Sequence, residues 1–119
     1  MKLRMNWRMS KMDESKYQVA FDLILKAGNA KSSSMMAIDL AIEFDFENAK
    51  KNLEEAENEM REAHAIQIGM IQQEAQGNPV ELNIILVHAQ DHMTMAIMAK
   101  EIAEQFVDLY ETIQELKNK

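Results

Sequence analysis

Residues 84–98 read IILVHAQDHMTMAIM, and this stretch decides the fold. Its apolar residues recur at spacings of three and four, which predicts an α-helix. They cover nearly the whole circumference of that helix instead of one face. A helix that is apolar all round has to be buried, and two companion helices from one chain would leave part of it uncovered. We therefore expect copies of the chain to associate along this helix.

The periodic pattern extends outward from this stretch in both directions. It predicts a helix over about residues 80–118, preceded by helices over about 14–43 and 46–76. Only three Gly and one Pro occur in the 119 residues, which is too few for the many turns of a sheet or barrel. The expected fold is all-α, an antiparallel three-helix bundle that assembles as a trimer of bundles, with residues 13–119 as its single domain.

Two short breaks separate the three expected helices. At the first, Asp45 is suited to be the N-cap of the second helix, because its carboxylate can accept hydrogen bonds from free backbone N–H groups. At the second, Gly77 is expected to stop the second helix. Pro79 is expected to stand at the start of the third helix.

The first helix carries two neighbouring stripes. One stripe is formed mainly by large apolar residues: Tyr17, Phe21, Ile24, Gly28, Met35, Ile38 and Ile42. The other is formed by small residues: Ala20, Ala27, Ala30, Ser34, Ala37 and Ala41. Small side chains allow close approach of another helix, so this helix is expected to have neighbours on two sides.

Composition excludes several classes of protein. A net charge of −7 argues against nucleic-acid binding, which needs a concentrated positive surface. Cys is absent, so disulfides and thiol chemistry are excluded. No apolar run approaches the length that spans a bilayer. Residues 1–12 are basic, lack the apolar core of a secretory signal, and are expected to be a mobile leader on a cytoplasmic protein.

The chemistry of the chain is expected at His88, Asp91 and His92. Relative to His88, Asp91 lies at i+3 and His92 at i+4, so all three side chains project from one side of the helix. Ionisable groups in so apolar a stretch are costly unless they are paired, hydrated or bound to something. A single histidine there would most often be a hydrogen-bonded core residue, but three such groups on one turn favour a functional site.

Three kinds of site compete to explain these residues. The His-x-x-x-His spacing suits zinc, but Ala89 stands where a zinc protease has its glutamate, and no motif for a third ligand is evident. A di-metal bundle needs paired Glu-x-x-His motifs, and none is present. The third possibility is a histidine that accepts a phosphoryl group. A neutral imidazole is a competent nucleophile near neutral pH, and transfer needs mainly positioning and charge stabilisation.

Three motifs carry a resemblance to a known family. They are AGNAKS at residues 27–32, EAHAIQ at 62–67 and HAQDH at 88–92. With these motifs the chain, from about Tyr17 to Leu116, resembles the enzyme IIA component of the lactose/cellobiose (N,N′-diacetylchitobiose) branch of the bacterial sugar phosphotransferase system.

The resemblance implies a phosphohistidine carrier of sugar uptake. His88 would accept a phosphoryl group from phospho-HPr and pass it to a cysteine of the cognate IIB protein, with His92 stabilising the phosphoryl group. The resemblance also implies a homotrimer in which Asp91 of each subunit binds a shared divalent cation, expected to be Mg²⁺. Three converging carboxylates would repel one another without a cation or protons. Contact with the membrane would be indirect, through the IIC component, in which sugar specificity mainly resides.

The sequence departs from the family pattern at two positions. Phe44 stands where the family usually has Gly, so we expect the first break to close differently. Thr94 is displaced by one position from the usual hydroxyl residue, which is about 100° around the helix. His64 has two open interpretations, a core histidine bonded to the backbone or a member of the active-site groove, and Gln67 is its candidate partner. Gln105 is expected either to pair with its symmetry mates or to set helix register.

Two other functions remain as alternatives. The main one is an acidic helical oligomer whose His/Asp cluster binds metal for structural assembly. The other is a histidine phosphotransfer domain of two-component signalling, which usually has Lys-Gly shortly after its histidine. Neither residue occurs between Ala89 and Ala99, which disfavours that domain.

Overall fold

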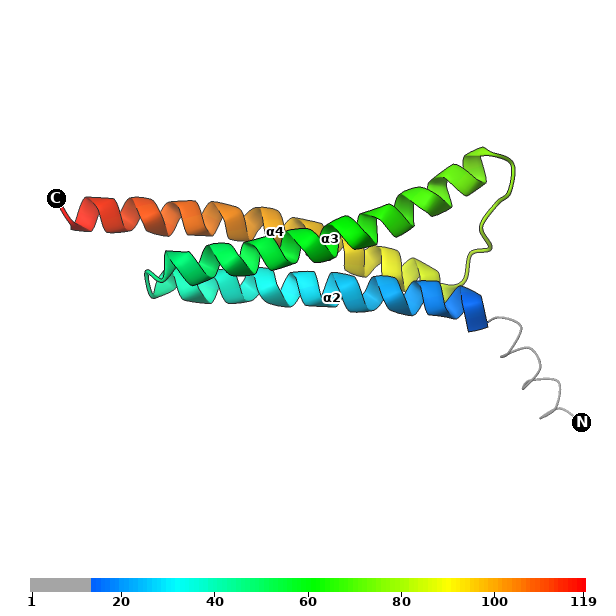
Figure 1. Ribbon diagram of the computed structural model, residues 1–119, viewed down its shortest axis with the longest axis horizontal. Coiled ribbons are helices and arrows are strands. Elements are labelled where there is room, and N and C mark those ends of the chain that lie inside the picture. Colours follow the sequence, from blue (N-terminus) through cyan, green and yellow to red (C-terminus); the bar gives the residue numbers. More distant parts are fainter. Residues whose placement is uncertain (1–13) are drawn as a thin grey trace, which may run out of the picture.

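The computed structural model describes residues 14–119, so the leader expected at residues 1–12 lies outside the described part. The described residues form three helices: α2 (Glu14–Ile42), α3 (Phe46–Ala75) and α4 (Ile84–Lys117). α2 and α4 run in the same direction, and α3 runs the opposite way (Figure 1). The expected all-α three-helix bundle is thus confirmed. None of these helices, within residues 14–119, is long and apolar enough to cross a membrane.

The turn between α2 and α3 closes as a glycine turn would, although it holds phenylalanine. Phe44 has φ of 63°, the left-handed conformation that glycine adopts most easily. The N–H of Phe44 donates to the carbonyl of Ala41 at 2.9 Å, and the N–H of Asp45 donates to the carbonyl of Leu40 at 2.9 Å. This pair of bonds is the Schellman arrangement that ends many helices. Our expectation of a differently closed turn was therefore wrong.

The strain at this turn predicts a difference between two substitutions of Phe44. Phe44→Ala keeps the free-energy cost of the left-handed backbone conformation at this position, whereas Phe44→Gly removes it. Both variants lose the same contacts of the phenyl ring. After allowing for the greater unfolded-state freedom of glycine, we expect Phe44→Gly to be more stable than Phe44→Ala by about 0.5 to 1 kcal/mol. Urea denaturation of both variants measures this difference. Equal stability of the two would show that the turn is unstrained.

The helix signals at the borders of α3 act as the sequence predicts. The carboxylate of Asp45 accepts a hydrogen bond from the backbone N–H of Asn48 at 3.3 Å, as an N-cap does. At the other end, Gly77 has φ of 89°. The N–H of Asn78 there donates to the carbonyl of Gln73 at 3.1 Å. Asp45 therefore starts α3 and Gly77 stops it.

The third helix begins later than the sequence predicts. α4 starts at Ile84 instead of near residue 80, so Pro79 is not at its first position. The reason is a cap further along the chain, because the side chain of Asn83 accepts a hydrogen bond from the N–H of Leu86 at 2.8 Å. Asn83 has extended backbone angles, as N-caps have. Residues 76–83 consequently form the connection that returns from α3 to α4.

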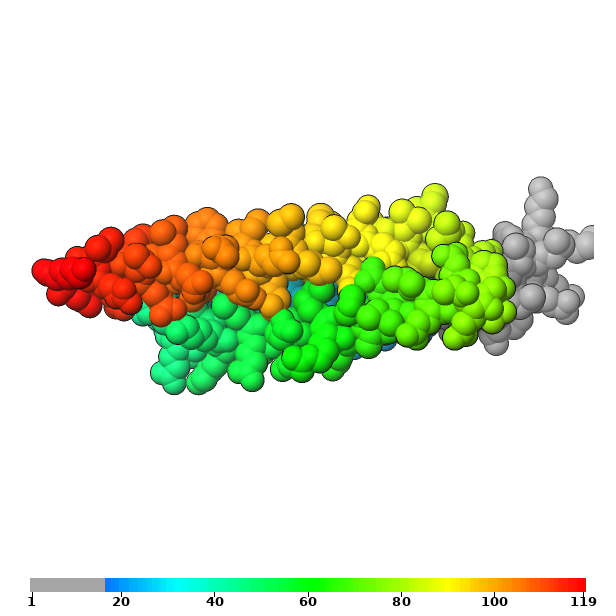
Figure 2. Space-filling model, turned by 90° about the horizontal axis from the view of Figure 1, so that it is seen from above, coloured from blue at the N-terminus to red at the C-terminus, as the bar shows by residue number. Residues whose placement is uncertain are grey.

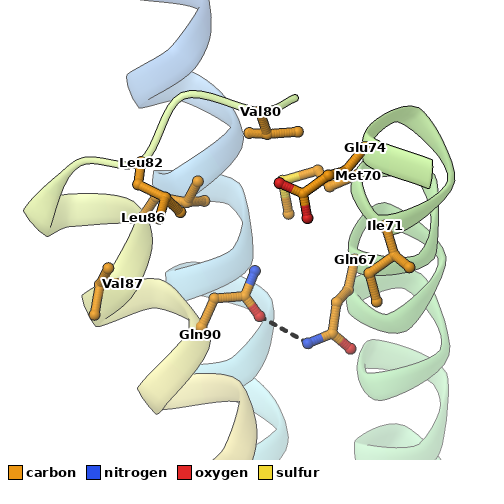
Figure 3. Close-up of a pocket in the computed structure, with 9 residues that line it drawn as sticks. All are labelled: Gln67, Met70, Ile71, Glu74, Val80, Leu82, Leu86, Val87 and Gln90. Atoms are coloured by element: carbon orange, nitrogen blue, oxygen red, sulfur yellow. Dashed lines mark hydrogen bonds between the residues drawn. The ribbon is translucent and has the colours of Figure 1, made fainter. Parts of the chain in front are cut away.

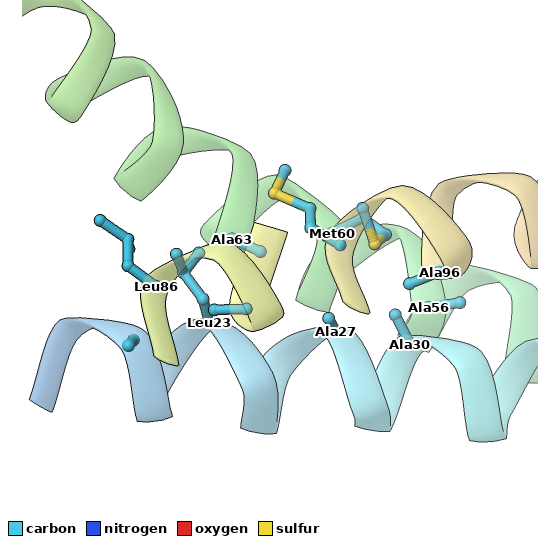
Figure 4. Close-up of a cluster of buried hydrophobic side chains, with 11 residues drawn as sticks. Leu23, Ala27, Ala30, Ala56, Met60, Ala63, Leu86 and Ala96 are labelled. Carbon is cyan, nitrogen blue, oxygen red and sulfur yellow. The ribbon is translucent and has the colours of Figure 1, made fainter. Parts of the chain in front are cut away.

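Small side chains form most of the buried core. Alanines at the helix contacts are completely buried: Ala20, Ala27, Ala30, Ala37, Ala41, Ala49, Ala56, Ala63, Ala89, Ala96 and Ala103. Few large side chains accompany them, chiefly Leu23, Met60 and Leu86 (Figure 4). Met93 belongs to the same cluster. On α2 the stripe of small residues therefore faces the other two helices. The stripe of large residues stays partly uncovered, with Phe21 exposed by 54% and Ile42 by 50%.

One side of α4 is uncovered along its whole length. The exposed stripe begins with Ile84 and Val87, continues through Met95, Met98 and Ile102, and reaches Leu109. Figure 2 shows α4, coloured from yellow to red, along one edge of the molecule. The green helix α3 lies next to α4, on the side away from that edge. The two companion helices thus leave a large apolar surface in solvent, as the all-round apolar pattern of this helix predicts.

Candidate functional site

The side chains of His88 and His92 lie against each other on α4. Their Nε2 atoms are 2.9 Å apart, and their rings meet edge to face with centroids 4.4 Å apart. A separation of four residues places both on one side of the helix, one turn apart. Such a contact requires one Nε2 to carry a proton and the other to offer its lone pair. His88 is exposed and His92 is half-buried, so a macromolecule can reach His88.

Asp91 lies within the uncovered apolar stripe of α4. Its side chain is exposed, and it precedes Met95 by one helical turn on the same side of the helix. Within residues 14–119 no group of three or more His, Asp or Glu side chains is placed to hold a metal ion. Among these described residues, Asp91 therefore belongs to no such group.

A hydrogen bond joins α3 to α4 beside these histidines. The amide of Gln67 donates to Oε1 of Gln90 at 2.7 Å, so Gln67 pairs with Gln90 and not with His64, for which it was a candidate partner. Both glutamines line a groove of about 280 Å³ (Figure 3). The other lining residues are mainly apolar: Met70, Ile71, Glu74, Val80, Leu82, Leu86 and Val87. This groove runs up to Val87, the residue before His88.

Gln90 is the site residue to which sequence reasoning assigned no role. It belongs to the HAQDH motif, but its position between the two histidines did not reveal a partner. That partner, Gln67, lies 23 residues earlier in the chain and belongs to the second motif. The only available signal was the presence of glutamine in both motifs.

His64 is not a core histidine. It is exposed on α3 and lines a separate cavity of about 270 Å³ together with Arg61, Ile97 and Lys100. One of the two interpretations, a buried histidine bonded to the backbone, is therefore wrong. This cavity does not include His88 or His92, so the structure does not bring His64 to the histidine pair within one subunit.

An ion-pair cluster stabilises the contact of α3 with α4 beside this cavity. The ammonium of Lys100 lies 2.6 Å from Oε2 of Glu57 in α3 and also bonds Glu104 one turn along α4. Burial opposes the charged form of Lys100, but the hydrogen bonds to Glu104 and Glu57 outweigh it and raise the pKa of Lys100. The same ammonium lowers the pKa of Glu57. Both cation and carboxylates are thus already paired within the subunit.

The two remaining candidates take no part in the histidine pair. The hydroxyl of Thr94 donates to the backbone carbonyl of Gln90 at 3.1 Å, which is an ordinary bond within the helix. Gln105 is exposed on α4, on the side of the helix that carries Asp91. Thr94 is therefore hydrogen-bonded within its own helix, whereas the side chain of Gln105 is exposed to solvent.

The arrangement suits a group transfer between macromolecules. An exposed imidazole can act as a nucleophile, and its neighbouring imidazole can supply a hydrogen bond to an anionic group on it. The surface beside His88 carries exposed apolar side chains, among them Ile84 and Val87. A partner protein can therefore bring the reacting group to this surface.

Comparison with known proteins identifies the family. The family described as "PTS system, Lactose/Cellobiose specific IIA subunit" matches residues 18–111. The lichenan-specific phosphotransferase enzyme IIA component of Bacillus subtilis is 42% identical over 104 residues, which cover 87% of this chain and 94% of that protein. The N,N′-diacetylchitobiose-specific EIIA component of Escherichia coli is 30% identical over 97 residues, which cover 82% and 84%.

Solved structures agree with this assignment. The crystal structure of the cellobiose-specific enzyme IIA from Bacillus anthracis is 40% identical, has a TM-score of 0.80, and matches 82% of this chain and 90% of that one. The IIA(Chitobiose) chain in the solution structure of its complex with HPr from Escherichia coli is 29% identical. Its TM-score is 0.71, with 82% of this chain and 94% of that chain covered. The chain belongs to the lactose/cellobiose-specific IIA family of the bacterial phosphotransferase system, and it is a phosphotransferase component.

Proposed function

We propose that this protein is a phosphohistidine carrier in which His88 accepts a phosphoryl group from phospho-HPr and passes it to a cysteine of a IIB protein. The observation that carries the proposal is the exposed His88, whose Nε2 lies 2.9 Å from Nε2 of His92. A carrier must present its nucleophile to two partners in turn, so exposure is required of it. The solved IIA–HPr complex among the similar structures supports HPr as the donor.

The transfer needs little from the protein beyond position and charge. An unprotonated nitrogen of His88 attacks phosphorus in line, forming an N–P bond while the bond from phosphorus to HPr breaks. His92 carries an N–H that can donate to an oxygen of the phosphoryl group, offsetting its negative charge. In the second step a thiolate of IIB attacks phosphorus, an S–P bond forms, and the imidazole of His88 leaves.

The surroundings of His88 support protein partners over a small substrate. The groove that ends at Val87 is lined mainly by apolar residues and is open to solvent. Apolar side chains are suited to contact with a partner's surface, whereas a sugar would need several hydrogen-bonding groups. The sugar is accordingly bound by another component of the system. The carrier itself acts in the cytoplasm.

The test of this function is direct phosphorylation. The full chain is incubated with phosphoenolpyruvate, enzyme I and HPr, and its intact mass is measured at alkaline pH. We expect a gain of one phosphate that is lost on acid treatment, since phosphohistidine is acid-labile. Addition of the IIB protein should remove the phosphate. Absence of any gain in the presence of active HPr would contradict the proposal.

The uncovered stripe of α4 supports a homotrimer built on this helix. The stripe carries Asp91 among Met95, Met98 and Ile102, so close packing of three copies would bring three carboxylates together. Carboxylate oxygens are the ligands that Mg²⁺ prefers, and Asp91 is exposed and free to meet its copies. A divalent cation held by three Asp91 side chains would offset their repulsion and strengthen assembly.

Replacement of Asp91 tests the cation. With chelator present, the wild-type trimer is expected to lose its cation and dissociate more readily, because three like charges face one another. Asp91→Asn keeps the shape but removes the charges, so its assembly should be insensitive to chelator. Native mass spectrometry and sedimentation measure both effects, with Asp108→Asn, an exposed carboxylate in the C-terminal half of α4, as control. A wild-type trimer without a cation would contradict the metal site.

A further inference from the structure

A groove lined by methionines lies between α2 and α4, away from the groove at Gln67 and Gln90. Its volume is about 520 Å³. The lining residues, which define what we call the methionine groove, are Met35, Ile38, Met95, Met98, Ala99, Ile102 and Phe106. Every one of these side chains is apolar. Because Met95 and Met98 also belong to the stripe that carries Asp91, the groove is continuous with the surface on which we propose that subunits associate.

The three methionines of this groove are each about half exposed to solvent in a single subunit. Met35 is exposed by 49%, Met95 by 46% and Met98 by 56%. The chain contains no Cys, so an oxidant has no thiol to react with, and the thioethers of methionine are the sulfur groups that it can oxidise. Exposed thioethers are oxidised readily, and the product is a polar sulfoxide.

We propose that Met35, Met95 and Met98 are an oxidative modification site whose oxidation blocks association of the subunits. This inference rests on the self-association proposed above and adds to it a means of control. The oxidant is a peroxide. The peroxide O–O bond breaks and an S–O bond forms, so that sulfur is oxidised by two electrons, one oxygen is transferred and the other leaves as water or alcohol.

The physical effect follows from where the sulfur atoms lie. Association along α4 would transfer these side chains from water into an apolar interface, which favours assembly because the thioether is apolar. A sulfoxide oxygen in the same interface would lose its hydrogen bonds to water, and the lining of the groove offers it no donor side chain. Burying one polar group without a partner weakens association about tenfold or more, so three sulfoxides should abolish assembly.

Assembly should in turn protect the same methionines. Their thioethers are exposed in the subunit but would be covered in the oligomer, so oxidation would proceed through dissociated subunits. We therefore expect slow oxidation at high protein concentration and fast oxidation at low concentration. Met36 is exposed by 50% and does not line the groove, which makes it a matched reference within the same molecule.

The experiment treats the full wild-type chain with hydrogen peroxide and follows two quantities. Peptide mass spectrometry measures sulfoxide at each methionine, and sedimentation measures the oligomer. A variant with Met35→Leu, Met95→Leu and Met98→Leu keeps side-chain volume and removes the sulfur atoms. Its control is Met36→Leu. We expect peroxide to convert the wild-type protein and Met36→Leu to subunits, and to leave the triple variant assembled.

The outcomes separate the two proposals. An oligomer that persists with Met35, Met95 and Met98 fully oxidised would overturn the modification site and leave self-association intact. Dissociation of the triple variant to the same extent as the wild-type protein would also overturn it. A wild-type chain that is monomeric before treatment would refute self-association itself, and with it this inference.

Discussion

The His88→Ala variant is expected to take up no phosphate from phospho-HPr. Removal of the imidazole removes the only nucleophile that the proposed transfer uses, so the rate should fall by a factor of about 10³ or more. The substitution should leave the fold intact, because His88 is exposed and its side chain hydrogen-bonds His92, another residue of the same helix. Alkaline intact-mass measurement over time gives the rate, and circular dichroism checks the helical content.

The other two histidines serve as graded controls for this result. His92→Ala keeps the nucleophile but loses the neighbouring hydrogen bond, so its transfer should be slower by about 10²-fold. His64→Ala should accept phosphate at the wild-type rate, because His64 lines a cavity that does not include His88. Phosphate found on the His88→Ala protein would assign the acceptor to another residue and refute the proposed role.

The largest effect on stability is expected at Leu23. Its side chain is completely buried in a core whose other members are mostly alanines, with Leu86 and Met93 among its few large neighbours. Alanines cannot move into a space left by leucine, so Leu23→Ala should create a cavity. We expect the free energy of unfolding to fall by about 2–5 kcal/mol. Urea denaturation at a fixed protein concentration measures this, since assembly makes stability concentration-dependent.

Leu25 provides the matched control for Leu23. It lies two residues further along α2 and is exposed by 61%, so Leu25→Ala removes the same atoms from a solvated position. Its effect on the unfolding free energy of the subunit should be within about 0.5 kcal/mol. Similar destabilisation by both substitutions would mean that α2 packs with a different face from the one the structure has.

Much of the site could be predicted from sequence because its central contact is local. His88 and His92 are four residues apart on a helix, and that spacing alone brings their rings together. The environment of His64 and the partner of Gln67 could not be predicted, because both depend on α4, which follows α3 after a turn. Sequence spacing within α3 says nothing about which α4 residues lie beside it.

Sequence alone determined the helices and most of their ends. Asp45 and Gly77 act through hydrogen bonds and backbone angles within a few residues, so their effects follow from their identity. The apolar circumference of residues 84–98 likewise predicted an uncovered surface on α4. The tertiary structure has that surface in solvent on one side of the helix.

The tertiary structure decided which stripe of each helix forms the core. On α2, alanines such as Ala27 and Ala30 are buried while Phe21 is exposed, because small side chains let three backbones approach closely. Hydrophobicity does not predict this choice, since both stripes are apolar. The start of α4 at Ile84 was decided in the same way, by a capping bond from Asn83 in the returning connection. The periodicity of the sequence shows which stripes of a helix could be buried. Only the packing of the other helices decides which of these stripes forms the core.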